Sequence, residues 1–301
     1  MKETKNWQTL LISIYVLVDE LVNRDSIDHL RWRFCKSNKK PKFTDEEVLT
    51  VYFFGLLSGL KEKKKIHEYA NNHLLEWFPE LVSYETYVDR LNKLDDLMVG
   101  ITGELRDQLL IDCSEPDNIR LLDSMPIILA KEKRRYTAKV APELADVGYC
   151  ASKNEKFYGV KLHIVGRKIE GTLPLPEFIG LTNGSIHDLK GGEAIANQIQ
   201  GGSLFDDRAY YFGDEFNEIL DSNGTLHFAV KKKKRNQKYL EIYDEVRNSD
   251  ISRIRQPIES LFNWICEKVD IQKGSKIRSM SGLMIHVFGR LSAALIGMLF
   301  F

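Results

Sequence analysis

Three acidic residues that lie far apart in the sequence have the chemistry of a shared metal site. Asp123 lies within the apolar segment 119–128. Asp207 directly follows the apolar run at 204–205 and Asp206, and Glu259 lies on a predicted helix. A buried carboxylate without a partner is unfavourable, so an aspartate in an apolar strand usually has a strong partner or a metal ion. Three converging carboxylates suit hard divalent cations, which prefer oxygen ligands.

The chemistry available to such a site is displacement at phosphorus. Two Mg2+ (or Mn2+) ions held about 3.5–4 Å apart would activate an attacking oxygen and stabilise the leaving oxygen of an in-line displacement. This reaction cuts or joins DNA strands. The three residues are too far apart for a local motif, so only the fold can bring Asp123, Asp207 and Glu259 together.

The helix that carries Glu259 must position it beside a core. Proline is tolerated near a helix start, so Pro257 predicts that this helix begins after the capping residues Asp250 and Ser252. Arg255 lies one turn before Glu259. The alternative to a metal site is therefore a surface Arg–Glu pair, worth about 0.3 kcal/mol.

The segment around the two aspartates has the pattern of an α/β domain. Three strands are expected first, then strands that alternate with helices, which predicts an antiparallel meander followed by parallel strands. The expected strands are 119–128, 158–165, 175–181, 204–206 and 225–230, with helices at about 188–200, 213–220 and after 250.

Residues 1–114 are predicted to be a helical DNA-binding region, and residues 115–301 the α/β domain with C-terminal helices. Thr44 and Glu47 have the spacing of a capping box, which predicts a helix start. Short helices at 44–60, 65–76 and 83–94 fit either a helix-turn-helix DNA reader or a plain bundle. In the first case the residues facing DNA would be Tyr84, Thr86, Tyr87 and Arg90.

Composition favours a folded protein of a reducing compartment. The net charge is zero, and the four cysteines form no CxxC pair that would indicate a zinc site or a disulfide framework. The apolar segment 282–301 is long enough for a membrane span. Arg290 near its middle would cost roughly 2.5–3.5 kcal/mol there, so we expect a buried closing helix and no membrane partner.

Two basic segments follow predicted strands and are candidate contacts for the DNA backbone. The alternative is that they are solvated charge runs. The residues are Lys131, Lys133, Arg134 and Arg135 in the first segment, and Lys231, Lys232, Lys233, Lys234 and Arg235 in the second.

Five segments in this order resemble the DDE transposases of bacterial insertion sequences, and most closely the insertion-sequence family nine-eighty-two. They are LLDSMPI at 121–127, YGVKLH at 158–163, SIHDL at 185–189, LFDDRAY at 204–210 and RQPIESLFNWI at 255–265. The resemblance covers nearly the whole chain. It implies that the α/β domain has an RNase H-like mixed sheet.

The resemblance also implies the roles of individual residues. Asp123, Asp207 and Glu259 would be the metal-binding triad, and Asp207 is preferred to Asp206 because it lies three residues before an aromatic. Arg255 would contact DNA phosphate. The chain departs from the related signature with Ser252 in place of a tyrosine and Cys266 in place of a lysine, and Lys268 is the candidate substitute for that lysine.

The implied activity is DNA cleavage at the terminal inverted repeats of an element, followed by transfer of the freed 3′-hydroxyl to target DNA. The implied partner is DNA, and the implied assembly is a homodimer or larger complex on DNA in the bacterial cytoplasm. Two alternatives remain: a nuclease of the same fold that only hydrolyses, and a non-catalytic DNA-binding protein derived from a transposase.

Overall fold

The computed structural model describes residues 7–32, 41–111, 118–150, 154–207, 209, 214–233 and 236–301. The chain folds into two compact units. The helical unit comprises Met1–Leu109, Ile265–Ile271 and Ile277–Phe301, and the sheet unit comprises Leu110–Trp264 and Gln272–Lys276. This division differs from a single cut at residue 114, because the chain returns to the helical unit after residue 264.

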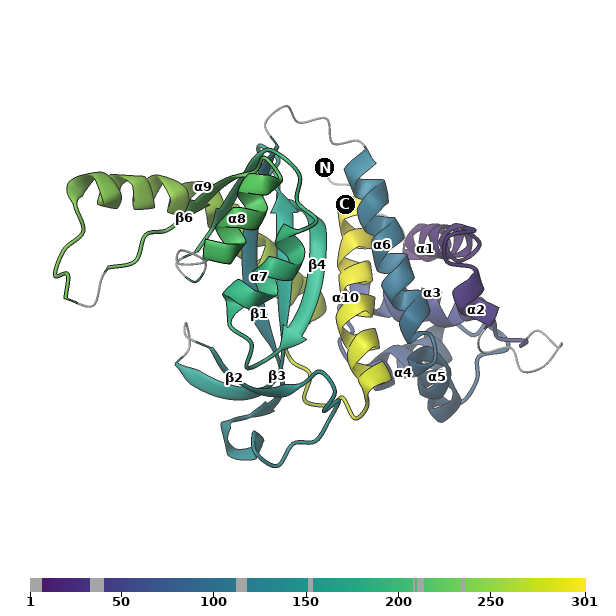
Figure 1. Ribbon diagram of the computed structural model, residues 1–301. Helices are drawn as coiled ribbons and strands as arrows, with labels where there is room; N and C mark the ends of the chain where they lie inside the picture. The colour runs from purple at the N-terminus through teal and green to yellow at the C-terminus, as the bar shows by residue number, and fades with distance from the viewer. Residues whose placement is uncertain are drawn as a thin grey trace. The chain divides into compact units, whose positions relative to one another are not determined.

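The helical unit is a bundle in which helix α3 is almost entirely buried. Its helices are α1 (Trp7–Val22), α2 (His29–Trp32), α3 (Asp45–Leu57), α4 (Lys63–His73), α5 (Tyr84–Asn92), α6 (Asp95–Ile111) and α10 (Met280–Phe300) (Figure 1). Nearly every residue of α3 from Val48 to Leu56 is buried, which is typical of a helix surrounded by others. Its start is confirmed: Thr44 and Glu47 form the predicted capping box.

The C-terminal helix α10 is long and apolar enough to cross a membrane by length and composition, and 72% of its most apolar window is buried inside the protein. Arg290 in its middle donates hydrogen bonds to the backbone carbonyls of Val269 and Lys61. Within the same unit Thr102 of α6 hydrogen-bonds Ser292, with 2.9 Å between the hydroxyl oxygens. These contacts are those of a core helix, as the sequence predicted.

The sheet unit contains a mixed six-stranded sheet. The strands are β1 (Ile119–Lys131), β2 (Asp146–Cys150), β3 (Glu155–Arg167), β4 (Leu175–Asn183), β5 (Ser203–Asp206) and β6 (Leu226–Ala229). The path is β2-β3-β1-β5-β6, and β4 pairs with the second half of β3. β3 is antiparallel to its neighbours β1 and β4, whereas β5 and β6 run parallel to β1. This confirms the predicted α/β class and is consistent with an RNase H-like fold.

Helices cover both faces of this sheet (Figure 1). One face packs its apolar residues against α7 (Asp188–Ala196) and α8 (Asp214–Ser222); this core comprises Leu122, Val165, Ile195, Ala196, Ile199, Leu204, Phe216 and Leu220. The other face packs against α9 (Ile242–Val269), where a Cβ on Gly166 would lie 3.0 Å from Cδ1 of Ile258. Ile164 is two residues from Gly166 on β3 and therefore points to the same face. Cross-strand partners share a face, so Asp123, which pairs with Ile164, also lies on the α9 face.

Two local predictions were wrong. Helix α9 begins at Ile242 and not near residue 250, so Pro257 lies inside it. A proline there leaves the carbonyl of Arg253 without its helical donor, and burial of Ile251 and Ile258 on either side offsets that loss. Strand β2 was not predicted, because only Val147 and Tyr149 in DVGYC favour a strand.

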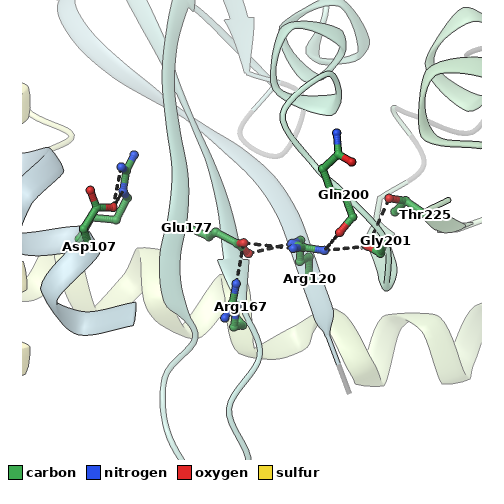
Figure 2. A network of polar contacts seen from close by, with 8 residues as sticks. Asp107, Arg120, Arg167, Glu177, Gln200, Gly201 and Thr225 are labelled. Atoms are coloured by element: carbon green, nitrogen blue, oxygen red, sulfur yellow. Dashed lines mark hydrogen bonds and ion pairs between the residues drawn. The ribbon is translucent and has the colours of Figure 1, made fainter. Parts of the chain in front are cut away.

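A buried charge network fixes the beginning of β1 (Figure 2). The side chain of Arg120 donates two hydrogen bonds to Glu177 of β4, at 2.8 and 3.1 Å, and another to the carbonyl of Gly201 at 2.8 Å. Arg167 of β3 donates to the same carboxylate at 2.8 Å. Both guanidinium groups lower the pKa of Glu177 against the opposing effect of burial. The network ties three strands together three residues before Asp123.

Candidate active site

The strand register brings Asp123 and Asp207 to the same level of the sheet. β1 and β5 are parallel neighbours, and Ile119, Arg120 and Leu121 pair with Ser203, Leu204 and Phe205, each 84 residues later. Asp207 is likewise 84 residues after Asp123 and is the first residue after β5. The recorded pairing ends at Leu121 and Phe205, and the same offset continued for two residues relates Asp123 to Asp207.

Arg255 joins the first and third acidic residues. From α9 its guanidinium donates to Oδ2 of Asp123 at 3.0 Å and to Oε1 of Glu259 at 2.8 Å. The Arg255 side chain is only 11% exposed, whereas that of Glu259 is 53% exposed. The Arg255–Glu259 pair is therefore not the isolated surface pair of the alternative reading, since its cation is buried against β1.

Electrostatic coupling links all three carboxylates. The pKa of Asp123 is raised to about 7, first because the group is buried and further because Asp207 and Glu259 carry negative charge nearby. The Arg255 guanidinium and the backbone N–H of Ser124 act in the opposite direction and lower it. The effect of Asp207 and Glu259 on Asp123 shows that the three acidic groups are close enough to repel one another, and a cation beside them is stabilising.

The donor set fits a hard divalent cation. Asp123, Asp207 and Glu259 offer only oxygen atoms, which Mg2+ and Mn2+ prefer. A cation, the guanidinium of Arg255, already binds two of the three. Within the described ranges no three histidine, cysteine, aspartate or glutamate side chains are placed to hold one ion together. The Arg255 guanidinium bonds to one oxygen of Asp123 and one of Glu259, and an ion held by this set would compete with it for them.

Asp206 has a different environment from its neighbour Asp207. Its side chain is fully buried and pairs with Nε2 of His227 on β6 at 2.7 Å. Burial raises the pKa of Asp206 to about 6, although His227 lowers it. Asp207 is partly exposed, and its Oδ1 accepts a hydrogen bond from the N–H of Ala209 at 2.6 Å. This contrast favours Asp207 as the metal ligand and gives Asp206 a role in pairing β5 with β6.

The first basic segment projects into solvent at the end of β1. Lys131 is exposed, as are Lys133 and Arg134 on the short helix η1 (Glu132–Arg134). Arg135 is half-buried, and its guanidinium lies 4.5 Å from the ring centre of Tyr136. These exposed cations remain candidates for DNA contact.

The described lysines of the second basic segment, Lys231 to Lys233, differ in their surroundings. Nζ of Lys231 pairs with Asp244 of α9 at 2.5 Å, which anchors the segment to the helix. Lys232 is half-buried, and Nζ of the exposed Lys233 lies 5.9 Å from the ring centre of Tyr239. Lys234 and Arg235 lie outside the described residues. Lys268 is exposed on the last turn of α9, in the part of that helix that belongs to the helical unit.

Two of the residues proposed to face DNA from the helical region are held within the protein. Tyr87 is fully buried in α5. Arg90 donates to Oδ1 of Asp45 at 2.7 Å and to the carbonyl of Phe43. A DNA-facing role does not fit the buried Tyr87, because the spacing that would point it at DNA is also the spacing of the buried face of α5. Thr86 is exposed and Tyr84 half-buried.

Lys161 and His163 of β3 and Asp188 of α7 lie on the α7 face of the sheet. His187 caps α7, where its ring Nδ1 accepts a hydrogen bond from the N–H of Leu189 at 3.3 Å. Asp188 instead pairs with Lys161 at 3.0 Å. Lys161 belongs to the segment YGVKLH and Asp188 to the segment SIHDL. Polar residues in these two segments, which contain none of the three carboxylates, were the only sequence feature that could indicate this pairing.

His163 is expected to make the sheet unit sensitive to acid. The ring is fully buried, with Nε2 at 2.8 Å from Oγ1 of Thr182 and Nδ1 without a partner among the described residues. Burial lowers its pKa to about 4. Below the unfolded pKa of about 6.5 the unfolded chain therefore binds a proton that the folded protein excludes, and about 2 kcal/mol of stability is lost by about pH 5.

This loss can be measured by urea unfolding at about pH 7.5 and pH 5. His163→Gln, which keeps a hydrogen-bond partner for Thr182 but does not titrate, is expected to show a smaller loss between the two pH values. Equal losses in both proteins would contradict the assignment.

Comparison with known proteins extends this description. A family model described as a transposase DDE domain matches residues 113–279, more than half of the chain. No curated protein matched the sequence, and no solved structure matched it either. The matched range contains β1, β5 and the Glu259 region of α9, and so all three carboxylates. The chain belongs to the family of transposases with a DDE domain.

Proposed function

We propose that this transposase cleaves DNA at the ends of a mobile element and joins the freed ends to target DNA. In the first reaction a water oxygen bonds to phosphorus and the bond from phosphorus to the 3′-oxygen breaks, which leaves a 3′-hydroxyl on the element. In the second, that 3′-oxygen bonds to a target phosphorus and a target 3′-hydroxyl leaves. No covalent bond between protein and DNA is required.

The residues proposed for this chemistry are the three coupled carboxylates. Asp123, Asp207 and Glu259 would hold two Mg2+ or Mn2+ ions. When bound, such ions activate the attacking oxygen and stabilise the leaving oxygen. DDE transposase domains generally depend on divalent metal ions. Arg255 has to withdraw from Asp123 and Glu259 first, and its guanidinium is then available for a DNA phosphate, for which its planar fork is suited.

The observation that carries the proposal is the cation held between two of the three carboxylates. Arg255 pairs with Asp123 and Glu259, and the charge of Asp207 acts on the pKa of Asp123. The charges of residues from β1, the end of β5 and α9 thus act on one another, although 84 and 52 residues of sequence separate them. A solvated surface pair would not explain a buried guanidinium shared by two acids.

DNA is the proposed partner, bound at the terminal repeats and at the target. The exposed Lys131, Lys133 and Arg134 and the segment that begins at Lys231 are proposed backbone contacts. The helical region and Lys268 are proposed to bind the element ends, in a homodimer or larger assembly. Membership of insertion-sequence family nine-eighty-two and a cytoplasmic location remain predictions from the resemblance.

The proposal is tested with purified full-length protein and duplexes made from the DNA that flanks the reading frame. Intact ends report cleavage, and ends already cut to a 3′-hydroxyl report joining to a target plasmid. We expect both reactions with Mg2+ or Mn2+, and neither with the metal chelated by EDTA. Restoring Mn2+ should restore both. Glu259→Gln is the control, expected to bind the ends without cutting them.

The other outcomes identify the alternatives. Cleavage without any joining of pre-cut ends would indicate a nuclease that only hydrolyses. Binding of the ends without metal-dependent cleavage or joining would indicate a non-catalytic DNA-binding protein. Cleavage that persists in EDTA, or full activity of Glu259→Gln, would remove the proposed mechanism.

A further inference from the structure

A second polar cluster lies behind the candidate active site, on the α7 face of the sheet. The hydroxyl of Ser124 donates to Oδ1 of Asp188 at 2.8 Å. Nζ of Lys161 donates to the same oxygen at 3.0 Å and to the carbonyl of Ile186 at 2.8 Å. The three side chains come from β1, β3 and the first turn of α7.

The cluster is built for contact within the protein. The side chain of Lys161 is 12% exposed and that of Asp188 is 30% exposed. The ammonium group of Lys161 points to a carboxylate and a carbonyl within the protein and not toward solvent, where a DNA phosphate would bind. Each member belongs to one of three motifs of the chain: LLDSMPI, YGVKLH and SIHDL. The carboxylate triad accounts for only one residue of these motifs, Asp123.

The backbone connects this cluster to Asp123. Adjacent residues of a strand point to opposite faces, so Ser124 faces α7 while Asp123 faces α9. The N–H of Ser124 donates to Oδ1 of Asp123 at 2.8 Å. Holding the Ser124 side chain through Asp188 therefore fixes the peptide group whose N–H orients the Asp123 carboxylate. Lys161 in turn fixes Asp188, because both hydrogen bonds meet at the same oxygen.

We infer that Ser124, Asp188 and Lys161 are positioning residues that orient the Asp123 carboxylate for metal binding. The inference rests on the proposed function, since it takes Asp123 as a metal ligand. Groups that hydrogen-bond to ligands typically change metal affinity about 10–100-fold when they are removed. A cluster that only joined α7 to the sheet would change stability and leave metal affinity unaltered.

Ser124→Ala is the most informative variant. It removes one hydroxyl and leaves the Lys161–Asp188 ion pair in place. Ser124→Thr restores a hydroxyl at the same position, and a β-branched residue suits a strand. The matched control is Thr182→Val, which removes a hydroxyl on the same face, where Thr182 bonds His163 and not the cluster. Asp123→Asn shows whether the Mn2+ signal comes from the proposed site.

The measurement is Mn2+ affinity of the full chain without DNA, by calorimetric titration, together with the melting temperature. Ser124→Ala keeps the N–H that bonds to Asp123 but loses the side-chain hydrogen bond that holds this peptide group. We therefore expect it to bind Mn2+ about 10-fold more weakly, at the low end of the range of about 10–100-fold, with Ser124→Thr close to wild type. Thr182→Val should lower the melting temperature at least as much as Ser124→Ala and leave Mn2+ affinity unchanged.

Two results would overturn the inference while leaving the proposed function intact. One is wild-type Mn2+ affinity in Ser124→Ala, and the other is an equal loss of affinity in Thr182→Val. A third result would contradict the proposed function itself. If wild type and Asp123→Asn bind Mn2+ equally, Asp123 is not a ligand, and both the proposed triad and this inference fall.

Discussion

Asp207→Asn is expected to lower the rate of DNA cleavage at least about 1,000-fold while the protein stays folded and binds DNA ends. An asparagine keeps the size of the side chain and the hydrogen bond from Ala209 but removes the negative charge. Without that charge the site loses one of three anionic ligands, and hard cations bind neutral amide oxygens less strongly than carboxylates. Cleavage rates of pre-bound ends with Mg2+ provide the measurement.

The adjacent aspartate provides the control. Asp206→Asn changes a buried carboxylate that pairs with His227, so we expect a loss of about 1–3 kcal/mol of stability with cleavage largely retained at low temperature. The two variants carry the same substitution at adjacent positions. If Asp206→Asn abolished cleavage and Asp207→Asn did not, the roles of the two residues would be exchanged.

Much of the sheet unit was predictable from local pattern. Strands β1, β3 and β4 carry apolar runs long enough to be identified, and the short β5 and β6 are bounded by turn residues. The meander followed by parallel strands then follows from the order of elements. The start of α9 was not predictable from Pro257, because burial of the flanking isoleucines decides whether a helix continues through a proline, and burial depends on the rest of the fold.

The sequence singles out the acidic residues proposed as ligands but not the contacts that they make with other side chains. The acidic residues stand out because a carboxylate in an apolar segment is unusual. Nothing in the sequence shows that Arg255 turns toward Asp123, since the only local signal is its spacing from Glu259. The sequence does not indicate the contacts of the Ser124–Asp188–Lys161 cluster either. Its members are separated by 37 and 27 residues in sequence and meet only through strand register.

Arg255→Gln is expected to bind Mn2+ about 10-fold more tightly than wild type in the absence of DNA. In the ion-free protein the guanidinium bonds to Asp123 and Glu259, so a metal ion has to displace it from both. Glutamine is neutral and competes weakly. Calorimetric titration should be done at about pH 8.5, because removal of Arg255 raises the pKa of Asp123 above its value of about 7, and protons would otherwise compete with the metal.

The same variant is expected to lose cleavage, because the released guanidinium is the proposed contact for a DNA phosphate. Metal affinity and cleavage should therefore change in opposite directions, which a simple loss of structure cannot produce. Arg253→Gln is the matched control: its side chain is 81% exposed and pairs with Asp250, so neither quantity should change. Weaker Mn2+ binding in Arg255→Gln would contradict the competition and would show instead that Arg255 holds the two carboxylates in place for the ions.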